Sequence, residues 1–315
     1  MAVQATSSYR VSRGTYLWFV APALAATFTI IVFPWVFTLY VSLQDWDAAG
    51  ASGFVGLGNY ARLATDERFL LSVLRTLYYT VLTVVAPLVL GTIAAVLLHR
   101  EFRFRGLVRG IFLLPMMATP VAIALVWAMM FHPQYGVLNY LLERVGLPAS
   151  LWVYAPDSVI PALALVETWQ WTPFTMLIVL GGLAAIPTDP YESATIDGAN
   201  SWQLFRHITL PLAMPFIMIA AVLRTIDAFK AFDTIYPITQ GGPGTASETI
   251  NVYLYLQAFS YTHIGSASAV VVVFFAMILV LAYVMLYLRQ RSAWPGSPRS
   301  RPTPATWCTC CRPRS

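Results

Sequence analysis

Glu167 is a carboxylate inside a long apolar run, next to side chains that bind polar ligands. A charge in such a run is costly to bury, so it usually faces a cavity or a partner. Trp169 and Trp171 follow it among threonine and glutamine residues, and these types stack on sugar rings and bind hydroxyl groups. Two interpretations stay open: a carbohydrate-like ligand passes this segment, or Glu167 bonds a neighbouring helix while the tryptophans pack.

A second set of charges recurs at every third position, and its members are Arg224, Asp227, Lys230 and Asp233. Residues three apart are neighbours on a helix, so charges of alternating sign would neutralise one another there. The pattern favours an ion-pair ladder that stabilises the end of a helix. Contact of Arg224 and Asp227 with a ligand is the second interpretation.

The familiar catalytic motifs are missing from the sequence. It contains no Gly-x-Ser-x-Gly and no His-Glu-x-x-His, the signatures of two hydrolase classes. Its only lysine, Lys230, follows residues 227–229 rather than a glycine, so the chain has no P-loop of its own. The histidines are scattered without metal-ligand spacing. The three cysteines, Cys308, Cys310 and Cys311, could bind a soft metal, but their position in the tail favours free thiols. We expect no catalytic residue, no metal site and no cofactor bound by this chain.

The composition indicates lipid as the solvent for most of the chain. Of 315 residues 58% are hydrophobic and only 10% are charged, against about 25% charged in soluble domains. The mean hydropathy of +0.67 therefore excludes an ordinary soluble protein. Long apolar runs, each at least about 20 residues, predict six membrane-spanning helices at roughly 16–43, 72–98, 107–131, 158–186, 210–231 and 265–288.

The arginines predict the orientation of these spans. With six spans both termini lie on one side, and that side collects most of the basic residues: Arg10, Arg13, Arg100, Arg103, Arg105, Arg109, Arg206 and those after position 288. Cytoplasmic loops carry such an excess, so we expect both termini in the cytoplasm. The domain boundaries follow: a cytoplasmic segment at 1–15, a six-helix membrane domain at 16–290 and a tail at 291–315, rich in Pro, Ser and Arg, that we expect to be disordered.

The connection between the fourth and fifth spans, about 189–211, predicts two short helices. Asp189 is placed to cap the first, with Pro190 at its first position and Glu192 completing a capping pair. Gly198 can adopt the left-handed conformation that ends this helix, and Ser201 can cap the second. This is more order than a tether needs, although an interfacial elbow is the alternative.

This connection resembles a motif of a known family. Glu192-x-Ala194-x-x-x-Gly198, nine residues and then Ile208-x-Leu210-Pro211 are similar to the EAA loop of binding-protein-dependent ABC importer permeases, with Ser193 where alanine is usual. Matches run in order from about 16 to 290 and include Gly56-Leu57-Gly58-Asn59-Tyr60, Trp169-Gln170-Trp171-Thr172-Pro173-Phe174 and Thr239-Gln240-Gly241-Gly242-Pro243. They resemble the carbohydrate-uptake branch, which includes maltose, glycerol-3-phosphate and polyol permeases.

The resemblance implies an all-α, six-span fold of the type I importer class, for a sugar, polyol or glycoside. It implies that Glu192, Ala194, Asp197 and Gly198 contact a cytoplasmic ATPase, while Leu210 and Pro211 join the elbow to the fifth span. It also implies a second permease subunit that is a homologous but different chain, an ATPase dimer that binds ATP and Mg, and an extracytoplasmic solute-binding protein. The location that it implies is the inner membrane of a prokaryotic cell.

Two other classes compete with this interpretation. An ion-coupled secondary transporter would have interrupted helices in repeated halves and carboxylates at mid-membrane, where Glu167 is the clear candidate. An intramembrane enzyme lacks support because its motifs and paired aspartates are missing.

Overall fold

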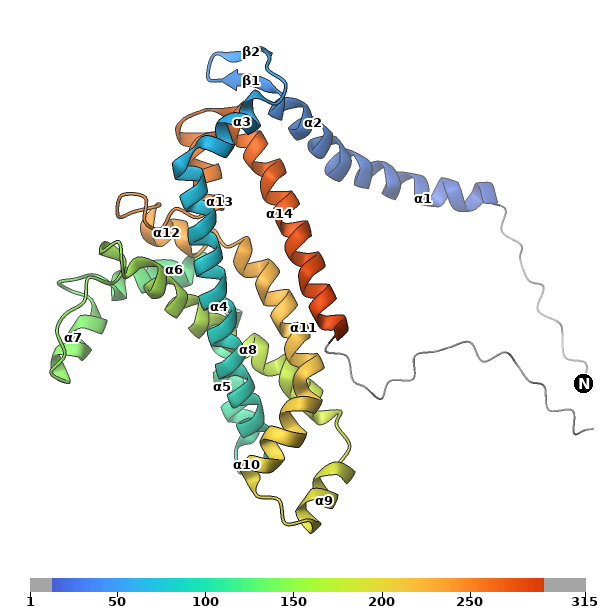
Figure 1. Ribbon diagram of the computed structural model, residues 1–315, viewed down its shortest axis with the longest axis vertical. Coiled ribbons are helices and arrows are strands. Elements are labelled where there is room, and N and C mark those ends of the chain that lie inside the picture. The colour runs from blue at the N-terminus through green and yellow to red at the C-terminus, as the bar shows by residue number, and fades with distance from the viewer. Residues whose placement is uncertain (1–12, 292–315) are drawn as a thin grey trace, which may run out of the picture. The chain divides into compact units, whose positions relative to one another are not determined.

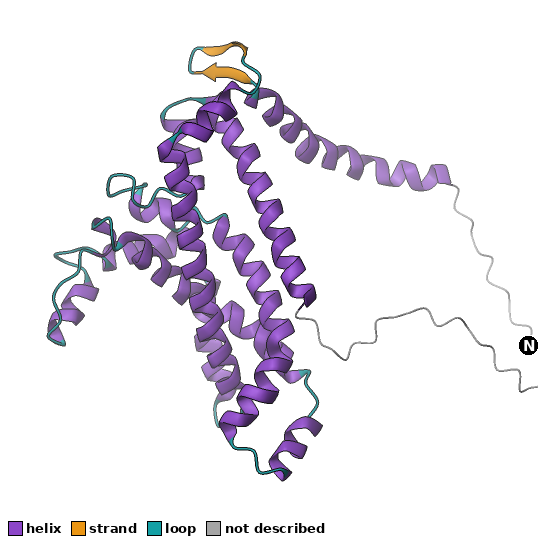
Figure 2. Cartoon of the chain, in the orientation of Figure 1, coloured by secondary structure: helices purple, strands orange, loops and turns teal. Residues whose placement is uncertain are grey.

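The computed structural model describes residues 13–291. Helices make up most of this range (Figure 2). The long helices, labelled in Figure 1, are α1 (Arg13–Thr27), α2 (Phe33–Ser42), α4 (Glu67–His99), α5 (Arg105–Met117), α6 (Pro120–Met130), α8 (Val159–Ala184), α11 (Leu210–Phe229) and α14 (Ile264–Arg291). The short helices are α3 (Gly58–Thr65), α7 (Val137–Arg144), α9 (Asp189–Ile196), α10 (Ser201–Leu204), α12 (Ile235–Thr239) and α13 (Ile250–Tyr255). Single π or 3-10 turns are η1 (Phe28–Val32), η2 (Trp152–Tyr154), η3 (Phe205–Thr209) and η4 (Leu256–Ser260).

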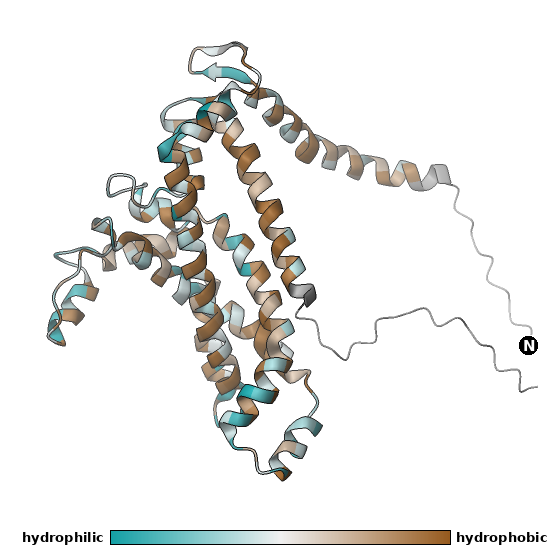
Figure 3. Cartoon of the chain, in the orientation of Figure 1, coloured by the Kyte–Doolittle hydropathy of each residue, from teal (hydrophilic) through white to brown (hydrophobic). Residues whose placement is uncertain are grey.

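Five helical stretches of the described residues are long and apolar enough to cross a membrane. They are Leu17–Ser42, Glu67–His99, Val159–Ala184, Ser201–Phe229 and Ile264–Leu288, and hydrophobic residues run along them (Figure 3). Five of the six predicted spans are thereby confirmed. The most apolar window of the first has none of its residues buried by the rest of the chain, so its side chains face lipid or a partner.

The third predicted span is broken rather than straight. Helices α5 and α6 meet at a bend of 91°. Ala118 there has an extended backbone with ψ 147°, and Thr119 precedes Pro120, whose ring disfavours the helical conformation of the residue before it. The six-span prediction thus holds when this bent pair is counted as one span, and the span predicted at 107–131 is interrupted at residues 118 and 119.

A small hairpin follows the first span and was not predicted. Strands β1 (Gln44–Asp47) and β2 (Gly50–Phe54) pair antiparallel, with Gln44 opposite Phe54. Gly50, the first residue of β2 after the turn, has φ +104°, a conformation that glycine adopts without steric cost. The hairpin is the only sheet of residues 13–291, and the fold remains all-α in class.

The chain divides into two compact units, each made of several segments. The first combines 1–80, 120–164 and 229–280, and the second combines 81–119, 165–228 and 281–315, as far as these residues are described. The core of the second unit gathers from α4, α8 and α11 and includes Ala95, Met176, Val179, Leu183 and Ala213.

Glycines allow the closest helix contacts of the second unit. A Cβ on Gly91 would lie 2.7 Å from Cβ of Thr175, and a Cβ on Gly182 would overlap the ring of Phe216. In a membrane the hydrophobic effect does not drive helices together, so helices that pack this closely rely on small residues at the contact. Gly181, by contrast, has open space around it.

Candidate coupling loop and buried ion pair

The first half of the candidate coupling loop is α9, an exposed helix of eight residues. Thr188 precedes it without a capping bond from its side chain, and Asp189 is already the first helical residue. The prediction that Asp189 caps the helix was therefore wrong by one position: Asp189 is the first helical residue and Pro190 the second, where its missing N–H costs nothing. Asp189 and Glu192 still place negative charge near the helix N-terminus, which the helix dipole favours.

Gly198 ends α9 as predicted. Its φ is +81°, and two backbone bonds close the turn: the amide of Gly198 donates to the carbonyl of Thr195 at 3.1 Å, and that of Ala199 to the carbonyl of Ala194 at 2.9 Å. This pair of bonds is the Schellman motif, which satisfies the last carbonyls of a helix. A Cβ at Gly198 would meet nothing within 4 Å, so the backbone conformation alone selects glycine within this chain.

Asn200, rather than Ser201, caps the second short helix. Its Oδ1 accepts from the amide of Gln203 at 2.9 Å, while Oε1 of Gln203 accepts from the amide of Asn200 at 2.8 Å. These two bonds form a complete capping box. The spacing Asn-x-x-Gln could have revealed it in the sequence, since both residue types suit their positions.

The loop joins the fifth span without a break in the helix. α10 continues through η3 into α11, which begins at half-buried Leu210 and exposed Pro211. The hydroxyl of Tyr191 donates to Oγ1 of Thr209 at 3.3 Å and so ties α9 to this elbow. Tyr191 was missed from the sequence because its role depends on a contact across 18 positions.

The outer face of the loop is open to a partner. Ile196 is 86% exposed, Glu192 and Asp197 are exposed, and Ala194 is half-buried. The exposed face of α9 therefore presents one large apolar side chain beside two carboxylates.

A buried ion pair joins α8 to α11 within the second unit. Nη2 of Arg224 donates to Oε2 of Glu167 at 3.1 Å and to the carbonyl of Thr83 at 3.3 Å. Arg224 is 1% exposed and Glu167 4%. The guanidinium carbon also lies 4.9 Å from the ring centre of Trp171, a cation–π distance. Glu167 thus bonds a neighbouring helix, and Trp171 belongs to the same cluster.

The other candidate path residues, Trp169 and Asp227, are exposed rather than buried. Trp169 is 43% exposed and lines an apolar groove of about 560 Å³ between α4, α5 and α8. Asp227 is exposed, and α11 ends at Phe229. The predicted ladder is therefore not formed as one row along a helix, because Lys230 and Asp233 lie beyond the end of α11 and Arg224 pairs with Glu167.

No metal centre is formed by the described part of the chain. Among residues 13–291 there is no group of three or more His, Cys, Asp or Glu that could hold an ion. Cys308, Cys310 and Cys311 lie outside the described residues, as does nearly all of the tail predicted at 291–315.

Comparison with known proteins settles the family. A model of the "binding-protein-dependent transport system inner membrane component" family matches residues 87–293. The chain belongs to this family. The trehalose/maltose transport system permease protein MalF of Thermococcus litoralis is 36% identical over 89% of this chain and 94% of its own length. The sulfoquinovosyl glycerol transport system permease protein SmoG of Agrobacterium fabrum is 36% identical over 84% of the chain and 87% of its own.

Solved structures agree with the permease fold. One chain of a bacterial ABC transporter involved in the import of the acidic polysaccharide alginate aligns with a TM-score of 0.77, at 22% identity over 89% of this chain and 98% of its own. A chain of the MetNI methionine ABC transporter aligns with a TM-score of 0.52 at 17% identity. The permease is accordingly a membrane-spanning transport subunit, and its helices adopt the fold of the type I importer class.

Proposed function

We propose that this permease is one membrane subunit of an ATP-driven importer for a sugar, polyol or glycoside in a prokaryotic inner membrane. It forms half of the path, and a second permease subunit forms the other half. ATP and Mg are bound by a cytoplasmic ATPase dimer, and an extracytoplasmic solute-binding protein delivers the substrate. The names of relatives such as the trehalose/maltose and sulfoquinovosyl glycerol permeases support a carbohydrate substrate.

The observation that carries the coupling role is the exposed helix α9 with its left-handed end at Gly198. In this proposal Glu192, Ala194, Asp197 and Gly198 enter a cleft of the ATPase, and Leu210 and Pro211 transmit its movement to α11. Closure of the ATPases on ATP pulls the coupling loops of both permeases together and opens the path outward. Hydrolysis then resets the pair. Both termini and the loop face the cytoplasm, as the arginine distribution favours.

The ion-coupled alternative needs a carboxylate at membrane depth that exchanges its ion or proton with solvent. Glu167 is the relevant carboxylate, and it is paired with Arg224 at 3.1 Å and nearly inaccessible to water. This pairing favours the ATP-driven importer.

The test is co-purification of the ATPase with Gly198→Asp, which adds both backbone strain and a charged side chain to the exposed turn. The matched control is Gly146→Asp, because Gly146 has φ +78°, is exposed and also has no atom within 4 Å of an added Cβ. It ends a different element, after α7 in the first unit.

Both variants should insert normally, because neither changes an apolar span. We expect Gly198→Asp to reduce bound ATPase about tenfold or more, equivalent to at least about 1.4 kcal/mol, and Gly146→Asp to leave it unchanged. Full ATPase binding and full transport by Gly198→Asp would refute the coupling role and leave the loop as an elbow.

A further inference from the structure

The connection between α11 and α14 is too long and too ordered to be a simple turn. It spans residues 230–263, whereas helix connections usually take about two to eight residues. It contains α12 and α13, and between them lies the stretch Gly241–Thr249, called here the strap loop. Long connections with their own structure usually carry function.

The strap loop is held in shape by its own contacts. Gly241 and Gly244 have φ +94° and +60°, which other residues adopt only at a cost. Oγ of Ser247 lies 2.7 Å from both Oγ1 of Thr239 and the carbonyl oxygen of Gly242. Ser247 is fully buried, so these bonds fix the loop from the inside.

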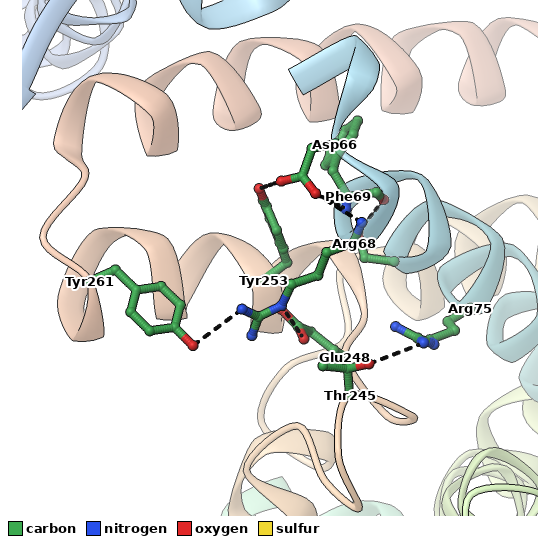
Figure 4. Close-up of polar contacts among 9 residues, drawn as sticks. Asp66, Arg68, Phe69, Arg75, Thr245, Glu248, Tyr253 and Tyr261 are labelled. Carbon is green, nitrogen blue, oxygen red and sulfur yellow. Dashed lines mark hydrogen bonds and ion pairs between the residues drawn. The ribbon is translucent and has the colours of Figure 1, made fainter. Parts of the chain in front are cut away.

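A buried carboxylate attaches the strap loop to α4, 180 residues away in the sequence (Figure 4). Nε of Arg68, in the first turn of α4, lies 3.0 and 2.9 Å from the two oxygens of Glu248. Glu248 is 1% exposed, and a buried carboxylate is unfavourable without its cation. The pair therefore resists separation of the loop from α4.

Further bonds surround this pair (Figure 4). The amide of Ile250 donates to Oγ1 of Thr76 at 2.9 Å, and Nη2 of Arg75 donates to Oγ1 of Thr245 at 3.3 Å. All of these partners belong to the first unit. The strap loop and the first residue of α13 are thus joined to the first three turns of α4 at several separate points.

Asp66 extends the attachment to α13. Its Oδ1 accepts from the amide of Arg68 at 2.8 Å, which caps α4, and its Oδ2 accepts from the hydroxyl of Tyr253 at 2.6 Å. Burial, together with the bond to Asp66, raises the pKa of Tyr253 above its ordinary value, so this hydroxyl keeps its proton at physiological pH.

The side of the strap loop that is not engaged with α4 is small and uncharged. Gly244 is exposed, and Pro243 and Ala246 are half-buried. A rigid neutral edge loses little conformational entropy when another protein covers it. In the orientation proposed above, this edge lies outside the cell, where the solute-binding protein approaches.

We propose that Glu248 is a positioning residue: through Arg68 it holds the strap loop on α4 in the shape that the solute-binding protein docks against. The inference rests on the proposed function for the side of the membrane and for the partner. Glu248 does not itself touch that partner, because it is buried under the loop.

The test titrates the solute-binding protein against the complete permease–ATPase complex in lipid vesicles and measures ATP hydrolysis. Glu248→Gln keeps the shape of the side chain but removes the charge that holds Arg68. We expect the half-saturating concentration of binding protein to rise about tenfold, while the maximal rate per assembled complex stays within about twofold. Ser247→Ala loosens the same loop without touching α4 and should raise the half-saturating concentration in the same direction.

The matched control is Glu101→Gln in the other unit, which removes the ion pair of Glu101 with Arg105. The side chain of Glu101 is 94% exposed, so this variant should change neither the half-saturating concentration nor the maximal rate. An unchanged half-saturating concentration, or a lower maximal rate alone, would overturn the proposal. If Glu248→Gln does not assemble, Ser247→Ala decides: a raised value supports the docking role and an unchanged value refutes it. A wild-type complex that the binding protein does not stimulate would instead refute the proposed function.

Discussion

Arg224 on α11 and Glu167 on α8 form an ion pair at 3.1 Å in which both side chains are nearly inaccessible to water. The guanidinium of Arg224 also contacts the Trp171 ring and the carbonyl of Thr83. The buried pair of opposite charges is neutral as a unit, although lipid would exclude either charge alone.

Breaking this pair on one side should cost more than removing it. Arg224→Gln alone leaves the Glu167 carboxylate buried without its cation and should destabilise the permease by about 3–5 kcal/mol. The double variant with Glu167→Gln should recover at least half of that loss. Thermal unfolding of the solubilised complex measures both. Equal loss in the single and double variants would show that the two charges do not depend on each other.

The capping box predicts different effects at two adjacent positions. Asn200→Ala removes the acceptor of the Gln203 amide and should destabilise the second short helix by about 1 kcal/mol. Ser201→Ala should have little effect, because Ser201 is inside the helix. Hydrogen exchange at the amide of Gln203 distinguishes them, with faster exchange expected only in Asn200→Ala. The reverse order would restore Ser201 as the cap.

Two adjacent glycines on α8 should tolerate alanine differently. A Cβ on Gly182 would overlap the ring of Phe216, whereas one on Gly181 meets nothing within 4 Å. Gly182→Ala should therefore destabilise the permease by about 1–3 kcal/mol through overpacking, and Gly181→Ala should leave its thermal midpoint unchanged. If the lower midpoint belongs to Gly181→Ala, the contact of α8 with α11 is misplaced.

The orientation can be tested with single cysteines in a chain whose three native cysteines are replaced by serine. Ala49, in the turn of the hairpin, and Ile196, at the end of α9, are both exposed. A reagent that does not cross the membrane should label Ala49→Cys in intact cells and label Ile196→Cys only after the cells are opened. Labelling of Ile196→Cys in intact cells would reverse the proposed topology.

Local chemistry in the sequence was enough to predict five of the spans and the end of α9. Apolar runs such as 265–288 exceed the length of a crossing helix, and a Gly after a polar helix, as at Gly198, adopts a left-handed conformation that no distant residue needs to impose. The capping errors at Asp189 and Ser201 were small shifts, because neighbouring residues compete for the same cap and pattern alone does not choose between them.

What the sequence could not decide depended on residues far apart in the chain. The sequence suggested Asp227, three positions away, as the partner of Arg224. Arg224 pairs instead with Glu167, 57 positions away, because α11 ends at Phe229 and α8 packs beside it. Glu248 gave no local signal at all, since its partner Arg68 lies 180 positions away. Helix formation and membrane insertion follow from short-range periodicity and hydropathy, but the partner of a buried charge follows from which helices pack together, and only the tertiary structure fixes that.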